Sequence, residues 1–541
     1  MRRSLLSLTF ALGCCCIVAV AAQSTALHTQ HSTDVPDPGP VPKYVADPIR
    51  LYTAGLGPFH REISTTNKEA QAFFDQGFQM MYAFAKLDAV RSFREAWKRD
   101  PDCAICYWGE AWAWGSYLNG PMSAEQSPFA YAAAKKALAL RDKATAHEQA
   151  FIDAIQVRYV KAFDPKKRVE QDRAYAEAMQ KVYEQYPNDL DAGTLYADAL
   201  FLLEPRRGTR DINAPNIKRL HGVLESVLTQ DAKHPGACHL YVHATESTAR
   251  PGKAEYCATL LGSTIPGASH INHMPSHTFN EVGRWGDSVR ANLQAWHSDQ
   301  KAEYGEGFAI YPDHNLHMLL YAAAMDGQGA IAIQAGKDYA KRTNDTMYHV
   351  LTLVRFGRFD EVLAVTARPE REIPGAAWDF AQGYAHLRTK QEDFARLYLA
   401  RVKKTADTAK AEFRSHSAKN LLGVLAGILD GEIERAAGNL DAAIAAFEHA
   451  VTADDALEYD EPEPLPFAAR HWLGAALLDA KRPADAERVY RKDLEDHPHN
   501  GWSLLGLQHA LKAQGKTDPA VDKDLEASWS RSDTWIRSSR F

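Results

Sequence analysis

A fixed spacing of small, aromatic and proline residues recurs at distant points of this 541-residue chain. In 73–102 a glycine is followed after 12, 16 and 24 residues by alanine, phenylalanine and proline: Gly77, Ala89, Phe93 and Pro101. The same offsets recur in 471–500 as Gly474, Ala486, Tyr490 and Pro498, and in part in 431–451 as Gly431, Ala443 and Phe447. Small side chains let two helices approach closely, an aromatic ring fills the space beside them, and proline ends the second helix. The spacing therefore predicts pairs of packed helices.

Helical periodicity extends over most of the chain. Nearly every segment after residue 67 has the apolar spacing of an amphipathic helix of about 10–15 residues, without strand-like alternation. Spacing and periodicity together resemble the tetratricopeptide repeat, a 34-residue helix–turn–helix unit. The resemblance implies an all-α fold, a right-handed superhelix (α-solenoid), with weaker units at 269–302, 343–370, 376–405 and 501–530. As a whole, the chain resembles exported bacterial proteins of this repeat family.

Changes in composition divide the chain into five parts. We expect a signal peptide at 1–21, a flexible linker at 22–48, an N-terminal helical repeat region at 49–234, central repeats with a histidine cluster at 235–370, and C-terminal tetratricopeptide repeats at 371–541. The irregular stretch 204–216 and the acidic, proline-rich stretch 454–467 are expected to be loops. Each is either a binding loop or hinge, or an ordinary surface linker.

The N-terminus has the pattern of an export signal. Arg2 and Arg3 precede an apolar run at 5–21 that ends in the small residues of Ala19-Val20-Ala21, as a cleavage site requires. We expect a periplasmic or secreted protein with no membrane span in the mature chain. The three cysteines at 14–16 leave a lipoprotein anchor as the less favoured alternative, because leucine is missing from its expected place.

Charge and cysteine content narrow the class further. The net charge of −7 becomes −9 when the signal segment takes away its two arginines, which argues against a nucleic-acid partner. Four cysteines remain after cleavage, and an oxidising compartment permits disulfides. We expect Cys103 and Cys106 to be structural rather than a redox pair. Cys238 is expected to pack in the core, with a bridge to Cys257 as the alternative.

Histidines gather in the central repeats, most densely in "GASHINHMPSH" at 267–277. Aligning three consecutive units by their packing residues places their starts at Pro235, Ser269 and Asp313. The following residues then fall at positions 2, 5, 9 or 12 of the first helix of a unit, which line the concave groove of the family: His239, His243, Glu246, His270, His273, His277, His314 and His317. Pro275 suits the first turn of a helix, so we expect a helix to begin near it and His270 and His273 to lie in the entering loop.

This arrangement predicts a transition-metal site. Residues at i and i+4 share a helix face, as His239 and His243 do, and neighbouring helices pack about 10 Å apart. Imidazoles from adjacent helices can therefore converge on one ion, with Glu246 or water completing the set. A histidine-rich site without thiolate favours copper or zinc, with iron less favoured. The alternative is a groove lined by hydrogen-bonded histidines.

Three functions follow from these patterns. The first is an extracytoplasmic metalloprotein, and in its catalytic form a copper- or zinc-dependent enzyme with the insertion 303–312 as a lid or supporting shell. The second is a non-catalytic scaffold that binds a peptide or protein partner in the groove, and the third is a metal carrier. We expect the concave groove to hold a peptide, a protein or a small-molecule ligand. The sequence contains no HExxH, GxxxxGK[ST], GxGxxG or GxSxG motif, so no known catalytic signature decides among them.

Overall fold

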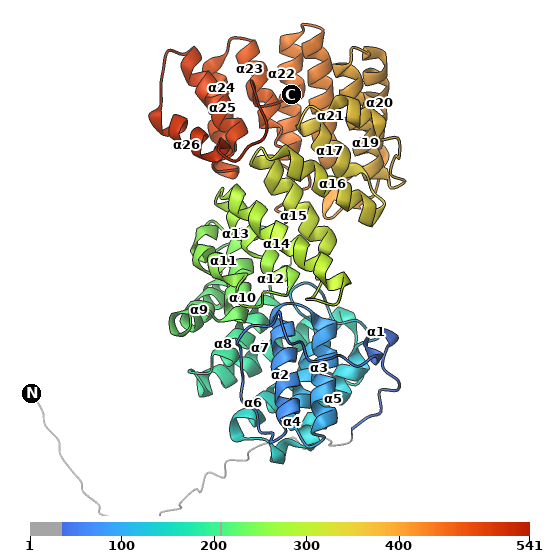
Figure 1. Cartoon of the computed structure of the whole chain (residues 1–541), viewed down its shortest axis with the longest axis vertical. Coiled ribbons are helices and arrows are strands. Elements are labelled where there is room, and N and C mark those ends of the chain that lie inside the picture. The colour runs from blue at the N-terminus through green and yellow to red at the C-terminus, as the bar shows by residue number, and fades with distance from the viewer. Residues whose placement is uncertain (1–34, 206–207) are drawn as a thin grey trace, which may run out of the picture.

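The protein is described by a computed structural model that covers residues 35–205 and 208–541. The predicted signal peptide and residues 22–34 of the predicted linker lie outside these ranges. The remainder of that linker contains α1 (Lys43–Ala46), whose Val45 is buried, and it contacts Arg91 through the carbonyl oxygens of Asp47 and Pro48. The helices form one elongated stack, with the N-terminal helices at one end and the C-terminal helices at the other (Figure 1).

The first part of the stack consists of short helices with tight connections. Its helices are α2 (Lys68–Tyr82), α3 (Lys86–Arg99), α4 (Ala104–Trp114), α5 (Ser127–Ala139), η1 (Arg141–Lys143), α6 (Ala146–Ile155), η2 (Pro165–Lys167), α7 (Arg168–Gln185), α8 (Leu190–Phe201) and α9 (Pro215–Gln230). The central part contains α10 (Pro235–Glu246), η3 (Pro251–Ala254), α11 (Glu255–Leu261), α12 (Ser269–His273), α13 (Pro275–Glu281), α14 (Trp285–Glu303) and α15 (Pro312–Met325).

The C-terminal part continues the alternation of packed helices. It contains α16 (Gly329–Thr343), α17 (Met347–Arg355), α18 (Phe359–Ala364), α19 (Glu372–Arg388), α20 (Glu392–Thr408), α21 (Ala418–Ala436), α22 (Leu440–Asp454), α23 (Arg470–Asp479), α24 (Pro483–Asp496), α25 (Gly501–Ala513) and α26 (Pro519–Trp529). A hairpin of β1 (Glu412–Phe413) and β2 (His416–Ser417) is the one sheet in the described residues. The all-α prediction is confirmed, and the hairpin was not anticipated.

The recurring glycine faces the recurring aromatic, as its spacing predicts. The three pairs are Gly77 with Phe93, Gly431 with Phe447, and Gly474 with Tyr490. A Cβ atom added to these glycines would lie 2.9, 2.5 and 2.4 Å from the ring, which is closer than any carbon contact allows. The three rings are fully buried, so each glycine exists to admit a ring. This packing makes the helix pairs tetratricopeptide-like.

Two hydrophobic cores share the central part of the chain. One core runs from Val45 to Ile310 and the other from Val289 to Val521, so their sequence ranges overlap at 289–310, in α14 and the insertion that follows it. The central helices α10 to α15 occupy the middle of the stack in Figure 1. Among the described residues, none of the helices has the length and apolar character needed to cross a membrane.

The expectation that His270 and His273 lie in a loop is wrong. Both are in α12, and α13 begins only two residues later at Pro275. Met274 between the two helices has helical dihedral angles, φ −52° and ψ −35°, and its amide donates to the carbonyl oxygen of His270. Proline fits there because the first positions of a helix have no intrahelical use for an N–H group. The helical path therefore continues through 269–281 with only a slight break.

Candidate metal centre

Six of the predicted histidines converge in two groups of three. Within each group one ring nitrogen from every member lies within 4.8 Å of the others. The first group is His239, His243 and His270, and the second is His273, His277 and His314. They come from α10, α12, α13 and α15, so helices of all three predicted units contribute.

The first group is a triangle of buried rings on α10 and α12. The ring centroid of His239 lies 5.1 Å from that of His243 and 4.9 Å from that of His270. The centroids of His243 and His270 are 6.2 Å apart. Phe84 packs against all three rings, closest to His239 at 4.2 Å between centroids. All three histidines are fully buried.

The second group lies directly beside the first. Its centroid distances are 4.7 Å from His273 to both His277 and His314, and 5.8 Å between the last two. The two triangles lie side by side. The ring centroid of His270 is 5.5 Å from that of His273, and the ring centroid of His243 is 5.3 Å from that of His277. His314 is half-buried and the others are buried.

Hydrogen bonds fix which nitrogen of each ring carries the proton. The Nδ1 atom of His239 lies 2.6 Å from the carbonyl oxygen of Tyr82, and that of His273 lies 3.0 Å from Oδ1 of Asn292. Carbonyl oxygens only accept hydrogen bonds, so both Nδ1 atoms donate. In a neutral imidazole this leaves the lone pair on Nε2, which is the atom then able to bind a metal ion.

Glu246 likewise accepts a hydrogen bond from the Nδ1 atom of one histidine in each group. One carboxylate oxygen lies 2.8 Å from Nδ1 of His243, and the other contacts Nδ1 of His277. A carboxylate accepts from both rings and leaves both Nε2 atoms as lone-pair donors. Glu246 is itself buried beneath these rings.

Two ring nitrogens also meet inside the second group. Nε2 of His273 and Nε2 of His277 are 2.8 Å apart, while Nδ1 of His273 contacts Asn292 and Nδ1 of His277 contacts Glu246. In the first group, Nε2 of His239 and both ring nitrogens of His270 are buried without a hydrogen-bond partner in the described part of the chain. Buried polar atoms of this kind cost free energy unless a ligand satisfies them.

Burial also keeps these rings neutral. Desolvation, followed by repulsion from neighbouring imidazoles, holds the pKa of His239, His270 and His273 well below the ordinary value. The pKa of His314 is lowered for the same reasons. A neutral imidazole is the form that binds a metal ion, so these residues need not lose a proton to do so at neutral pH.

A further carboxylate, that of Glu461, lies beside the histidines. Glu461 forms a third group with His243, Glu246 and His277, and its Oε2 atom lies 3.8 Å from Nδ1 of His277. It belongs to the acidic loop 454–467, which the sequence left open as a binding loop or a linker. No spacing rule connects Glu461 to His277, which is 184 residues earlier, so sequence reasoning missed it.

His317 is not brought into either triangle. Its Nδ1 atom accepts a hydrogen bond of 2.7 Å from Arg414, at the turn of the β1–β2 hairpin, and its ring stacks on Tyr348 at 4.1 Å. The single lone pair of its neutral ring is therefore used by Arg414. Arg414 is held in turn by Asp460, 2.6 Å away.

Three residues at the site have left-handed backbone dihedral angles, which are rare for residues other than glycine. They are Phe84, Tyr311 and Arg414, with φ of 59°, 56° and 62°. Such conformations cost about 1–3 kcal/mol each and tend to cluster at functional sites. Tyr311 is the second-last residue of the insertion 303–312, and its ring lies perpendicular to that of His270, 5.2 Å between centroids. The part of the insertion that reaches the histidines is this tyrosine.

A cavity of about 300 Å³ opens onto both triangles. His243 and His270 of the first group and His277 and His314 of the second line it. The rest of its wall is Asn119, Tyr311, Arg414, Tyr459, Asp460 and Glu461. The space is at the lower end of the range for small-molecule sites.

A second cavity, of about 410 Å³, borders the same acidic loop and is lined by carboxylates. Burial and neighbouring acids raise the pKa of Glu281 to about 8 and that of Asp454 to about 7. Both carboxyl groups can therefore hold a proton near neutral pH. Their cavity shares the acidic loop with the cavity at the histidines.

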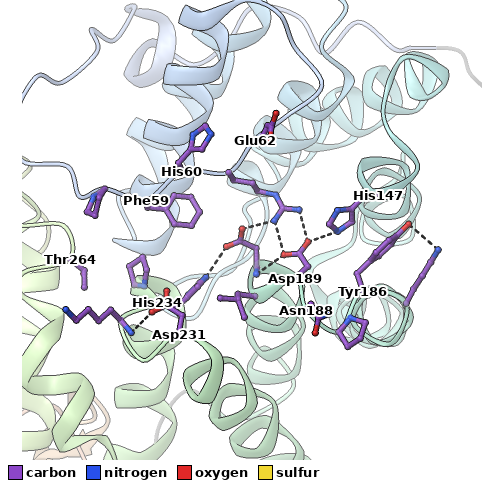
Figure 2. Close-up of a pocket in the computed structure, with 18 of the residues that line it drawn as sticks. Phe59, His60, Glu62, His147, Tyr186, Asn188, Asp189, Asp231, His234 and Thr264 are labelled. Atoms are coloured by element: carbon purple, nitrogen blue, oxygen red, sulfur yellow. Dashed lines mark hydrogen bonds and ion pairs between the residues drawn. The ribbon is translucent and has the colours of Figure 1, made fainter.

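A larger cavity lies elsewhere, between the N-terminal and central helices, and measures about 1120 Å³. Its charged groups are mostly paired with one another: Arg61 contacts Asp189 and Asp191 at 2.9 and 2.7 Å. Figure 2 shows His147 directed at Asp189, 2.7 Å away. The hydroxyl of Tyr82 donates to Asp191 over 2.6 Å, while its carbonyl oxygen accepts from His239.

Both cysteine pairs are joined in disulfides. Cys103 bonds to Cys106, and Cys238 bonds to Cys257. The second bond was the alternative for Cys238, and it ties α10, which carries His239 and His243, to α11. The first is a local link at the start of α4.

Comparison with known proteins finds similar solved structures but no matching family. No protein-family model matches the sequence, and no curated protein matches it. Among solved structures, Cut9 in the APC/C Cut9–Hcn1 hetero-tetramer matches over 88% of this chain and 78% of its own, with 12% identity and a TM-score of 0.30. Yeast Tom70 matches over 85% and 93%, with 9% identity and a TM-score of 0.27. The TPR domain of P58(IPK) matches over 82% and 98%, with 11% identity and a TM-score of 0.20.

The helix pairs and their glycine–aromatic contacts define the class. The chain is an all-α superhelix of tetratricopeptide-like repeats, with a buried histidine cluster in its central helices.

Proposed function

We propose that this chain is an exported protein that binds copper or zinc through the histidines of its central repeats. One observation carries the proposal: buried imidazoles converge with their Nδ1 atoms held by acceptors, so their Nε2 atoms are directed at one another. A structural histidine is normally satisfied by its neighbours, whereas Nε2 of His239 and both ring nitrogens of His270 are buried without a hydrogen-bond partner in the described residues and are placed as the ligands of a common ion would be.

Copper is favoured over zinc by the geometry of His273 and His277. An ion about 2.05 Å from both Nε2 atoms, which are 2.8 Å apart, would see them at about 86°. Tetragonal Cu(II) prefers angles near this value, while a tetrahedral zinc site would hold the two nitrogens about 3.3 Å apart. Iron is less favoured, because a site of imidazoles with few carboxylates suits copper better.

Catalysis is favoured over simple metal carriage by the cavity at the site. A carrier needs only to enclose its ion, whereas here about 300 Å³ of space reaches histidines of both groups. A small molecule of this size would contact the metal directly, and Tyr311 of the insertion 303–312 would form part of the wall, as a supporting residue.

Export is supported by two features of the chain. The predicted signal peptide at 1–21 has the charged, apolar and small-residue parts of a cleaved leader. Two disulfides are typical of oxidising compartments such as the periplasm or the extracellular space.

The second candidate function is a non-catalytic scaffold. It is favoured by the cavity of about 1120 Å³ in Figure 2, which is large enough for side chains of a peptide or protein partner. The polar groups of this cavity are largely satisfied by each other, and for that reason we place the scaffold second.

Elemental analysis tests the proposal. The mature chain, purified without chelators from cells supplied with copper and zinc, should contain stoichiometric metal by mass spectrometry. The double variant His239→Ala/His277→Ala should lose it, and His297→Ala/His449→Ala, at two exposed histidines, should keep it. Metal-free wild-type protein from such cells, unable to take up either ion in vitro, would overturn the proposal and leave the scaffold.

A further inference from the structure

We propose that the histidine cluster binds two metal ions side by side, one in each group of three, with Glu246 positioning both. The inference rests on the proposed metal-binding function and goes beyond it. It assigns His239, His243 and His270 to one ion, and His273, His277 and His314 to the other.

The size of each triangle fits one ion. An imidazole nitrogen bound at about 2.0–2.1 Å places the ring centroid about 3.2 Å from the metal, so rings at ligand angles of about 90–120° have centroids about 4.5–5.5 Å apart. The observed sides average within this range, at 4.9, 5.1 and 6.2 Å in the first group and 4.7, 4.7 and 5.8 Å in the second. Each triangle therefore needs only small adjustments to close on an ion.

A single ion cannot use all six rings. The ring nitrogens that lie within 4.8 Å of one another form two threes rather than one set of six, and the group that joins the threes takes only His243 and His277, with Glu246 and Glu461. Within one group the Nε2 atoms of His273 and His277 are already 2.8 Å apart, at the separation of two ligands of one ion. The unpartnered nitrogens of His239 and His270 lie in the other group and are left for a second ion.

Glu246 has the contacts of a positioning residue shared by two sites. Its two oxygens accept from Nδ1 of His243 and Nδ1 of His277, one ligand from each group. Carboxylates that accept from metal-bound histidines orient the ring and raise its basicity. One buried carboxylate with this double role explains why the two triangles lie side by side.

The cavity at the site reaches both proposed ions. It is lined by two histidines of each group, and Arg414 and Glu461 also line it. A pair of ions with a common open side can hold a small ligand between them, as two-metal centres do at separations of about 3.5–4 Å. The ligand class that fits is thus a small molecule able to contact both metals.

Copper titration of the mature, disulfide-bonded chain tests the pair. We expect two equivalents of Cu(II) to stay bound through desalting in wild-type protein. His239→Gln and His273→Gln, each in one group only, should retain one equivalent, and His297→Gln, at an exposed histidine, should retain two. Electron paramagnetic resonance should show magnetic coupling between the two Cu(II) ions in wild-type protein and an uncoupled signal in each single variant.

The outcomes separate the two proposals. Wild-type protein that binds no copper or zinc overturns the metal-binding function itself. One equivalent, or two uncoupled ions, overturns the pair and keeps the function. Circular dichroism melts confirm that each variant is folded, and His314→Gln, at the half-buried member of the second group, should repeat the loss of one equivalent with less disturbance of the core.

Discussion

Replacing Glu246 with glutamine tests the role of its carboxylate with almost no change of shape. The carboxylate accepts from Nδ1 of His243 and from Nδ1 of His277. Glutamine offers one accepting oxygen and one amide nitrogen that only donates, so it can serve one ring and opposes the other. The opposed ring must turn or move its proton to Nε2, which removes its lone pair from the metal.

The expected magnitude follows from this loss. Removing a hydrogen-bond acceptor from a metal-bound histidine lowers metal affinity about 10–100-fold, or about 1.4–2.7 kcal/mol. Because glutamine still serves one ring, Glu246→Gln should weaken one copper ion by this factor and the other by much less. Glu177→Gln, at an exposed site on α7, is the matched control and should bind as wild type.

Competition against a chromophoric copper chelator measures both affinities. Two equal affinities within a factor of two of the wild-type values would refute the positioning role. A loss far beyond 100-fold, together with a shifted visible spectrum of the bound copper, would instead identify Glu246 as a direct ligand, as the sequence first suggested.

Three further predictions concern stability. Removing the Cys238–Cys257 disulfide by a double alanine substitution should lower the free energy of unfolding by about 3 kcal/mol, from the entropy of a loop of 19 residues, as urea denaturation would measure; a loss below about 1 kcal/mol would contradict this. Gly431→Ala should cost about 1–3 kcal/mol, because the added Cβ would lie 2.5 Å from the ring of Phe447, and an unchanged melting temperature would show that the ring can move aside. Burial raises the pKa of Asp198 to about 6 from 3.8, so its contribution to stability is fully present below about pH 3.8 and is lost as the pH rises through 6. Asp198→Asn should therefore gain roughly 2–3 kcal/mol over wild type at pH 7 and nothing at pH 3.5; equal stability of the two proteins at pH 7 would refute it.

The sequence predicted those parts of the structure that follow from local spacing. The glycine at offset 0 and the aromatic at offset 16 lie on the two helices of one repeated pair, and Gly77 of α2 does face Phe93 of α3. The repeat phase likewise brought His239, His243 and His277 toward one another before any contact was known. Both predictions use periods that a helix imposes on every sequence it contains.

The parts that were missed depend on contacts without a period. Glu461 enters from a loop with no helical spacing, and Arg414 from a two-residue turn between strands too short to show alternation. The left-handed conformation of Phe84, which brings its ring onto three histidines, has no signal in the residue type. Such features are selected by tertiary packing, which one sequence does not display.

The repeat positions of the histidines did not by themselves predict the proposed division of the cluster between two ions. The rise of a helix along its axis explains the division. A helix rises about 1.5 Å per residue, so His270 and His277 are separated by about 10.5 Å along the axis of the nearly continuous α12–α13 path. Two ligands of one ion are at most about 4.2 Å apart, so these side chains would have to lean toward each other by several ångström. In the structure His270 instead contacts His239 of α10, and His277 contacts His273, which lies between them along the path. A groove stripe with histidines at positions 2, 5 and 9 of one unit is therefore too long for a single metal site. When its neighbours also carry histidines, such a stripe favours two.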